Sequence, residues 1–148
     1  MLLLNAKAES VAQKPSFRES LRRRRCLIPA NGFFEWQKVG TRKQPYHFHL
    51  ADGSPFAFAG IWEEADEKPA CCIITTEANE LVRPVHDRMP VIVPREQFGL
   101  WLDPDQHQAA ELLPLLVPYP AERMTATAVS TRVNSAKYDG PECVQPAA

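Results

Sequence analysis

The sequence predicts an α+β protein built on a twisted, mostly antiparallel sheet or partial β-barrel, with a few short helices. Short segments rich in aromatic and β-branched residues, such as 33–39 and 70–76, recur along the chain between turn residues. Helical patterns are few, and no strand–helix–strand rhythm indicates a parallel sheet. A length of 148 residues predicts a single domain, and no internal repeat or linker divides the chain.

The first elements are a strand and a helix. Residues 1–4 are apolar and predict a strand that leads into Asn5. Ser16 and Glu19 have capping-box spacing, which predicts a helix from Phe17 to about residue 24. Four arginines at 22–25 close this helix. They suit either a helix C-terminus or a phosphate-binding patch, and their spread around the helix axis favours the first interpretation.

The next segments predict strands. Residues 26–28 and 33–39 are strand-like, with a bend at 29–32 and a polar turn at 40–44. Residues 46–50 alternate large apolar and polar side chains, which predicts a half-buried strand. Its two histidines share one face. Two imidazoles at this spacing can bind a metal, but no third ligand stands nearby, so a solvated face is favoured.

Strands also dominate the middle of the chain. Asp52-Gly53 predicts a hairpin turn, and 55–62 predicts an aromatic-rich strand in which Gly60 marks either a close approach of neighbouring groups or a bulge. Residues 70–76 predict a central, buried strand. The two adjacent cysteines of that strand alternate faces, and we interpret them as packing residues.

The last part of the chain combines helices with two further strands. Residues 91–93 predict a strand that follows a polar loop. Helices are predicted from Pro94 through 102 and from about 105 to 116, and a final strand at 125–129. The prolines at 141 and 146 predict an irregular tail.

Composition excludes several classes of protein. No apolar run approaches the ~20 residues that cross a bilayer. The four cysteines show no disulfide or zinc spacing, so we expect a reducing, cytoplasmic location with no metal and no cofactor. A net charge of −1 gives no global case for a nucleic-acid partner, and any such case is local.

Two short motifs carry candidate chemistry. His86, Asp87 and Arg88 stand together ahead of Pro90, so a polar loop is held on a strand. Glu35 lies among three aromatic residues, where desolvation raises the pKa of a carboxyl. A carboxyl of raised pKa and a histidine form a plausible acid–base pair. Each motif alone is also explained by a surface loop and an outward-facing strand residue.

The motifs in their order carry a resemblance. Residues 5–9 (NAKAE), 26–36 (CLIPANGFFEW) and 85–90 (VHDRMP) follow one another, and 129–134 (VSTRVN) with 139–142 (DGPE) close the series. The succession resembles the SRAP family, the SOS-response-associated peptidase-like proteins that act at abasic sites in single-stranded DNA. The resemblance runs from Asn5 to about Pro146.

The resemblance implies roles for six residues. Asn5 orients the sugar, while Glu35 and His86 move protons as catalytic groups. Lys7 stands where the family has arginine, so it keeps the charge without the bidentate fork. Lys7 and Arg88 hold DNA phosphates, and Trp36 offers a stacking face.

One departure shapes the functional hypotheses. The family uses a cysteine directly after the initiator methionine, whose amine forms a Schiff base with the abasic-site aldehyde and whose thiol closes a thiazolidine. Leu2 occupies that position here, and the segment that precedes the first motif in the family is absent, so we expect an N-terminally shortened member. The alternative is a non-covalent binding module for single-stranded or abasic DNA. A third interpretation is the family's peptidase, limited to self-removal of an N-terminal residue.

Overall fold

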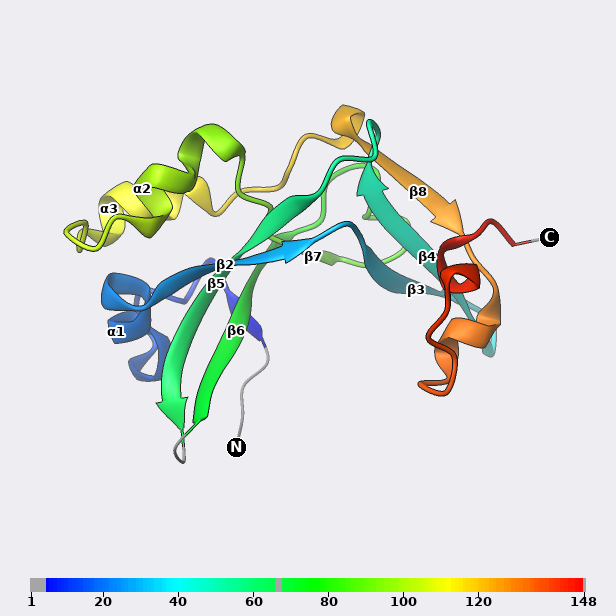
Figure 1. The fold of residues 1–148 in the computed structure, drawn as a ribbon, viewed down its shortest axis with the longest axis horizontal. Coiled ribbons are helices and arrows are strands. Elements are labelled where there is room, and N and C mark those ends of the chain that lie inside the picture. The colour runs from blue at the N-terminus through cyan, green and yellow to red at the C-terminus, as the bar shows by residue number, and fades with distance from the viewer. Residues whose placement is uncertain (1–4, 66–67, 148) are drawn as a thin grey trace.

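Two β-sheets form the body of the protein, and short helices pack at one side of it (Figure 1). The computed structural model describes residues 5–65 and 68–147. The first sheet has the order β1-β6-β5-β2, and β7 also pairs with β6. Its strands are β1 (Asn5–Lys7), β2 (Arg25–Ala30), β5 (Phe56–Ala65), β6 (Lys68–Glu77) and β7 (Arg88–Pro90). The β1–β6 pair is parallel and the other pairs are antiparallel.

The second sheet is a three-stranded antiparallel sheet with the order β3-β4-β8. It consists of β3 (Phe33–Val39), β4 (Arg42–Leu50) and β8 (Met124–Ala128). The C-terminal segment, with 3₁₀ turns at Thr131–Asn134 and Pro141–Val144, lies beside this sheet at the right of Figure 1. The α+β class with mostly antiparallel sheets is confirmed. The strands that the structure describes do not close into a barrel.

Glycine allows the chain to pass from the first sheet to the second. β2 leads into β3 through a bend at Asn31 and Gly32. A side chain at Gly32 would overlap the imidazole of His47, so only glycine fits where the chain passes β4 before it enters β3. Gly60 is a second close approach, as predicted, because a Cβ there would lie 2.8 Å from the Cys26 Sγ atom. The crossing at Gly32 brings Glu35, on β3, opposite the first sheet.

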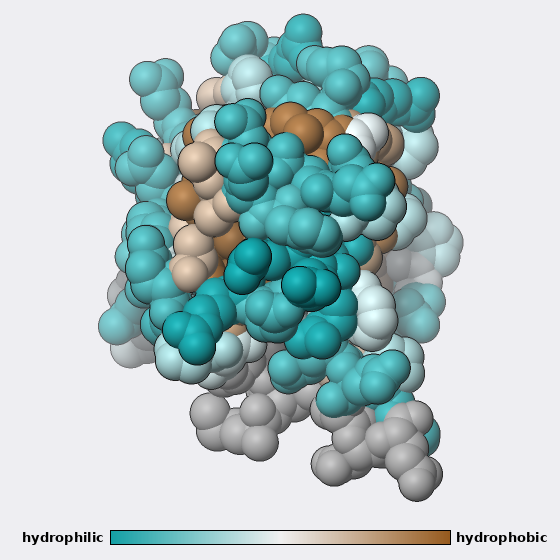
Figure 2. Space-filling model, turned by 90° about the vertical axis from the view of Figure 1, so that its left-hand side faces the viewer, coloured by the Kyte–Doolittle hydropathy of each residue, from teal (hydrophilic) through white to brown (hydrophobic). Residues whose placement is uncertain are grey.

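Two hydrophobic cores hold the elements together. One lies between the first sheet and helices α1 (Pro15–Arg23), α2 (Phe98–Leu102) and α3 (Ala109–Leu112). The other lies between the two sheets and includes Phe48, Phe58 and Met89. Seen from the side of the three helices, the surface is mostly hydrophilic, with apolar atoms visible in smaller areas (Figure 2). None of the helices in the described residues is long and apolar enough to span a membrane.

Two predicted helices have different bounds. α1 begins at Pro15, one residue after Lys14 as N-cap, and Ser16 lies inside the helix without making a capping bond. The capping-box prediction was therefore wrong, because proline at the first helical position starts the helix on its own. The predicted helix at 105–116 is shortened to α3 and a 3₁₀ turn at Leu113–Leu115. Pro114 has no N–H to continue an α-helix.

Strand bounds also differ from the prediction. β4 begins at Arg42 inside the predicted turn, which is reduced to two residues. The strand predicted at 91–93 is instead β7, which ends at Pro90. After β7, the backbone N–H groups of Val91 and Val93 donate to Ile74 and Ala57, the Val91 carbonyl accepts from Ala59, and Ile92 forms an isolated bridge with Phe58. The strand expected at 1–4 lies outside the described residues.

Two predictions of exposure were wrong. His47 was expected on a solvated face, but it is only 9% exposed, stacks on His49 and packs against the tilted ring of Phe34. Cys71 was expected to be a packing residue, but it is exposed, while its neighbour Cys72 is buried. The period of two places alternate residues on opposite faces, but it does not say which face another element covers.

Candidate active site

Five of the six predicted site residues line one cleft of about 390 Å³. Asn5 and Lys7 come from β1, Glu35 from β3, and His86 and Arg88 from β7 and the connection before it. The rest of its wall is Thr75 and six aromatic and aliphatic side chains: Phe33, Phe34, Phe58, Ile73, Met89 and Pro90. The cleft therefore combines an apolar wall with a few convergent polar groups, a typical composition for a binding site.

Glu35 is the desolvated acid of this cleft. Burial raises the pKa of its carboxyl, as the surrounding aromatics predicted. Positive charge on His86 and the backbone N–H of Trp36 act in the opposite direction, and Asp87 adds to the rise in pKa. The charge of His86, in the connection before β7, is thus felt by Glu35 on β3. A carboxyl of raised pKa holds its proton closer to neutral pH and can donate it.

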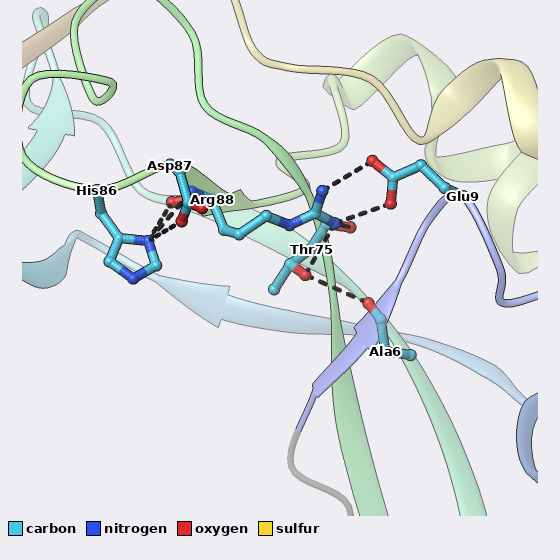
Figure 3. Close-up of polar contacts among 6 residues, drawn as sticks. All are labelled: Ala6, Glu9, Thr75, His86, Asp87 and Arg88. Atoms are coloured by element: carbon cyan, nitrogen blue, oxygen red, sulfur yellow. Dashed lines mark hydrogen bonds and ion pairs between the residues drawn. The ribbon is translucent and has the colours of Figure 1, made fainter.

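His86 is held by its own backbone neighbours (Figure 3). Its Nδ1 accepts a hydrogen bond of 3.1 Å from the backbone N–H of Arg88. The same nitrogen lies 3.1 Å from the backbone carbonyl oxygen of Arg88, and the tautomer that accepts from the N–H carries its proton on Nε2. Asp87 Oδ1 lies 3.5 Å from Nδ1. In that tautomer, His86 has an N–H donor for an oxygen in the cleft.

Arg88 is bound within the protein rather than free (Figure 3). Its two terminal nitrogens donate to the two carboxylate oxygens of Glu9, at 2.8 and 2.9 Å. It also donates to the backbone oxygen of Thr75 at 2.8 Å. Arg88 in turn lowers the pKa of the Glu9 carboxyl, chiefly by this hydrogen bond. Glu9 belongs to the first quoted motif, but the sequence analysis gave it no role.

Contacts of two side chains, the buried Asn79 and the more exposed Gln37, fix the loop that carries His86, and sequence reasoning missed both. Asn79 Oδ1 accepts from the backbone N–H groups of Leu81 and Val82, and its amide donates to the Tyr119 carbonyl. Gln37 donates to the Pro84 carbonyl at 2.9 Å, which ties the loop to β3. Gln37 shares a strand face with Glu35 by the period of two, and this is the one signal that pointed to it.

Trp36 lies outside the cleft lining. It is 36% exposed, and its indole N–H donates to the Asn134 side chain. The arginines at 22–25 lie on the far side of the first sheet, at the end of α1. A larger cleft of about 420 Å³ near Arg95 and Arg123 contains none of the predicted site residues. Among the residues that the structure describes, no group of three acidic, cysteine or histidine side chains is placed to hold a metal ion.

The fold and the cleft define an α+β protein with an acid–base site edged by cations. The family described as "SOS response associated peptidase (SRAP)" matches residues 1–136. The chain belongs to the SRAP family, as the succession of motifs predicted.

Relatives with similar sequences carry one functional name. The abasic site processing protein YoqW of Bacillus subtilis is 42% identical over 97% of this chain, and the match covers 66% of that protein. The abasic site processing protein YedK of Escherichia coli is 31% identical, with 97% of this chain and 67% of that protein covered. For HMCES of Gallus gallus, also named an abasic site processing protein, identity is 31% and the match covers 49% of that protein.

Solved structures show the same fold. A crystal structure of a protein from Bacteroides thetaiotaomicron superposes with a TM-score of 0.87 at 34% identity, over 99% of this chain and 66% of that one. The chain thus spans about two thirds of the length of its bacterial relatives. The activity of those whole proteins is carried to this chain only as a proposal.

Proposed function

We propose that this chain is an abasic-site processing protein that acts on single-stranded DNA. The observation that carries the proposal is the convergence of Glu35, on β3, and His86, in the connection before β7, in one cleft edged by Lys7. The names of the relatives support the substrate. The open form of an abasic sugar carries an aldehyde, and acid–base groups are what imine formation at an aldehyde requires.

Each cleft residue has a proposed role. An amine adds to the aldehyde and the adduct loses water, and protonated Glu35 supplies the proton that this loss needs. His86 donates from Nε2 to the sugar oxygen during ring opening. Asn5 orients the sugar, and Lys7 holds a flanking phosphate. Arg88 reaches a phosphate only by exchanging its Glu9 partner, and Trp36 stacks on a base outside the cleft.

The cleft itself supplies no thiol for covalent capture. None of the four cysteines is among its lining residues. Burial raises the pKa of the Cys72 thiol to about 11, so little of it is thiolate at neutral pH. We therefore propose that cross-linking, and any lyase step that follows an imine, needs an N-terminal cysteine, and that the polypeptide with Leu2 binds without capture. Four free cysteines support a reducing, cytoplasmic location.

A non-covalent binding module is the second candidate function. The absence of the four cysteines from the cleft lining favours it. The 148 residues should give no adduct with abasic single-stranded DNA that survives denaturing electrophoresis. A stable adduct would contradict this candidate. The peptidase activity that the family description names is proposed only as self-removal of an N-terminal residue.

The acid–base roles are tested in a form of the protein whose first residue is cysteine. Glu35→Gln and His86→Ala should each slow single-turnover adduct formation on an abasic oligonucleotide at least ten-fold, because general acid–base participation typically contributes ~10²–10⁴-fold. Glu64→Gln, an exposed strand residue outside the cleft lining, is the matched control. Circular dichroism monitors the fold. Parent rates in both variants would mean that the two residues are structural.

A further inference from the structure

The tip of the β3–β4 hairpin concentrates positive charge that the described part of the chain does not neutralise. Lys38, Arg42 and Lys43, named here the tip cations, surround the turn at Gly40 and Thr41, and all three are exposed. Residues 36–51 contain no aspartate or glutamate. The ion pairs found among the described residues involve Arg23, His86 and Arg88, and none involves a tip cation.

The strand register makes the tip cations destabilising for the protein when no ligand is bound. Lys38 is the direct cross-strand partner of Lys43. Directly opposite residues of an antiparallel pair share a face with Cβ atoms ~5 Å apart, and like charges there are destabilising. Charges of mixed sign would keep a hairpin tip equally soluble, so solubility alone does not explain charges of one sign. Two facing ammonium groups without a carboxylate are instead suited to an external anion.

The same face of the hairpin offers an aromatic ring. Trp36 stands two residues before Lys38, so both side chains project from one face of β3. The ring is 36% exposed, and the bond from its indole N–H to Asn134 holds it in place. A stacking ring followed by two cations matches the alternation of base and phosphate in an unpaired strand.

The tip cations also lie close enough to the cleft for one DNA strand to contact both. Glu35 and Lys38 are three residues apart on β3, which is ~10 Å along the strand, and their side chains project from opposite faces, so the DNA strand passes round the free edge of β3, the outer strand of its sheet. At the ~3.4 Å spacing of stacked nucleotides, this distance corresponds to about three nucleotides. A strand whose abasic residue occupied the cleft would therefore reach the tip cations within a few nucleotides.

We propose that the face of the β3–β4 hairpin formed by Trp36, Lys38 and Lys43 binds the single strand that leads away from the residue held in the cleft. Trp36 stacks on a base near the cleft, and the two lysines bind the next phosphates. This inference rests on the proposed function and extends it, because it assigns a path to the flanking strand. Arg42 projects from the opposite face, beside Val39, and takes no part in this contact.

Binding to two abasic oligonucleotides tests the path. The short one carries a single nucleotide on either side of the abasic site, and the long one carries about ten. The double variant Lys38→Gln, Lys43→Gln should bind the long oligonucleotide about ten-fold more weakly at low salt, with a salt slope reduced by ~1.4 for two lost phosphate contacts. Its binding to the short oligonucleotide should be unchanged. Lys38→Arg, Lys43→Arg should restore parent affinity.

A second variant separates binding from stability. Lys38→Glu places a carboxylate opposite Lys43, so it should raise the melting temperature slightly while weakening binding of the long oligonucleotide. Lys14→Gln, Arg18→Gln removes the same charge from α1 and is the matched control.

The possible outcomes are distinct. If the hairpin variants bind the long oligonucleotide like the parent or like the control, the path is wrong and the proposed function stands. If the parent binds neither oligonucleotide, both fail. Equal competition by a polyglutamate peptide of the same charge would show a general anion surface and overturn the assignment to a strand.

Discussion

Two clusters of cations in this protein differ in whether other groups of the protein bind them. The arginines at 22–25 are the denser cluster in the sequence, yet all four are bound within the protein. Arg25 alone donates to the backbone carbonyls of Trp101, Asp103, Leu21 and Arg22, with bonds of 2.5 to 2.8 Å. The tip cations are fewer, and in the described part of the chain no ion pair includes them.

The difference follows from the backbone acceptors near each cluster. α1 and α2 end beside Arg25, and the last carbonyls of a helix have no partner within it. A guanidinium carries five donors in a fixed fork and can satisfy several such carbonyls at once. On the hairpin, the register pairs β3 with β4 up to Val39 and Arg42, so ladder bonds use many of the carbonyls. The density of positive charge in a sequence therefore does not identify the charge that is free for a ligand.

The largest expected effect is a loss of stability when an arginine of the cluster at 22–25 is replaced. Arg25→Ala should lower the free energy of unfolding by about 2–4 kcal/mol, because it leaves carbonyls of two helix ends without their charged donor. Urea denaturation followed by circular dichroism measures it. Arg22→Ala removes one bond, to the His107 carbonyl at 3.3 Å, and should cost under about 1 kcal/mol. Equal losses in the two variants would contradict the assigned role of Arg25.

Arg88 is an intermediate case, because it binds one exposed carboxylate, of Glu9, in addition to Thr75. Glu9→Gln removes the charge that holds the guanidinium, so it should increase affinity for single-stranded DNA about three- to ten-fold and steepen the salt slope by ~0.7 for one added phosphate. Glu19→Gln, which breaks the Arg23 pair on α1, is the control. A fall in affinity for Glu9→Gln would show that Glu9 instead holds Arg88 in its binding position.

Much of the candidate site could be predicted because its residues stand in short motifs. Glu35 and His86 were assigned from their neighbours in sequence and Asn5 from the family resemblance, and all three line the cleft. The sequence could not show that Glu9 binds Arg88, since 79 positions separate them and their contact depends on the β1–β6 and β6–β7 pairings. The Gln37–Pro84 bond likewise exists only because β3 crosses between the sheets at Gly32.

The fold class followed from strand patterns, but element ends depended on single residues. Pro15 moved the start of α1, and Pro114 ended α3. The sequence did not predict the burial of His47, because the groups that cover it, such as Phe34, come from another strand. Periodicity identifies the faces of a strand, whereas packing of other elements decides which face is exposed.

The smallest expected effect concerns the pH dependence of the Glu9–Arg88 pair. The pKa of Glu9 is lowered from 4.5, first by the Arg88 hydrogen bond, so the folded state favours the carboxylate. The stabilisation is therefore present above pH 4.5 and is lost as the pH falls through the lowered pKa. Because the Glu9 side chain is 56% exposed, solvent screening limits the contribution to under about 1 kcal/mol.

Comparison of parent and Glu9→Gln at two pH values measures this contribution. Glutamine mimics the protonated carboxyl, so the parent should be more stable at neutral pH, and the gap should close as the pH falls below the lowered pKa of Glu9. Over the same range, the DNA affinity of the parent should approach that of the variant, because protonation of Glu9 releases Arg88 in the same way. A stability gap that is independent of pH would mean that Glu9 acts through shape and hydrogen bonding rather than charge. Arg88 would then resemble the arginines at 22–25, which are bound within the protein.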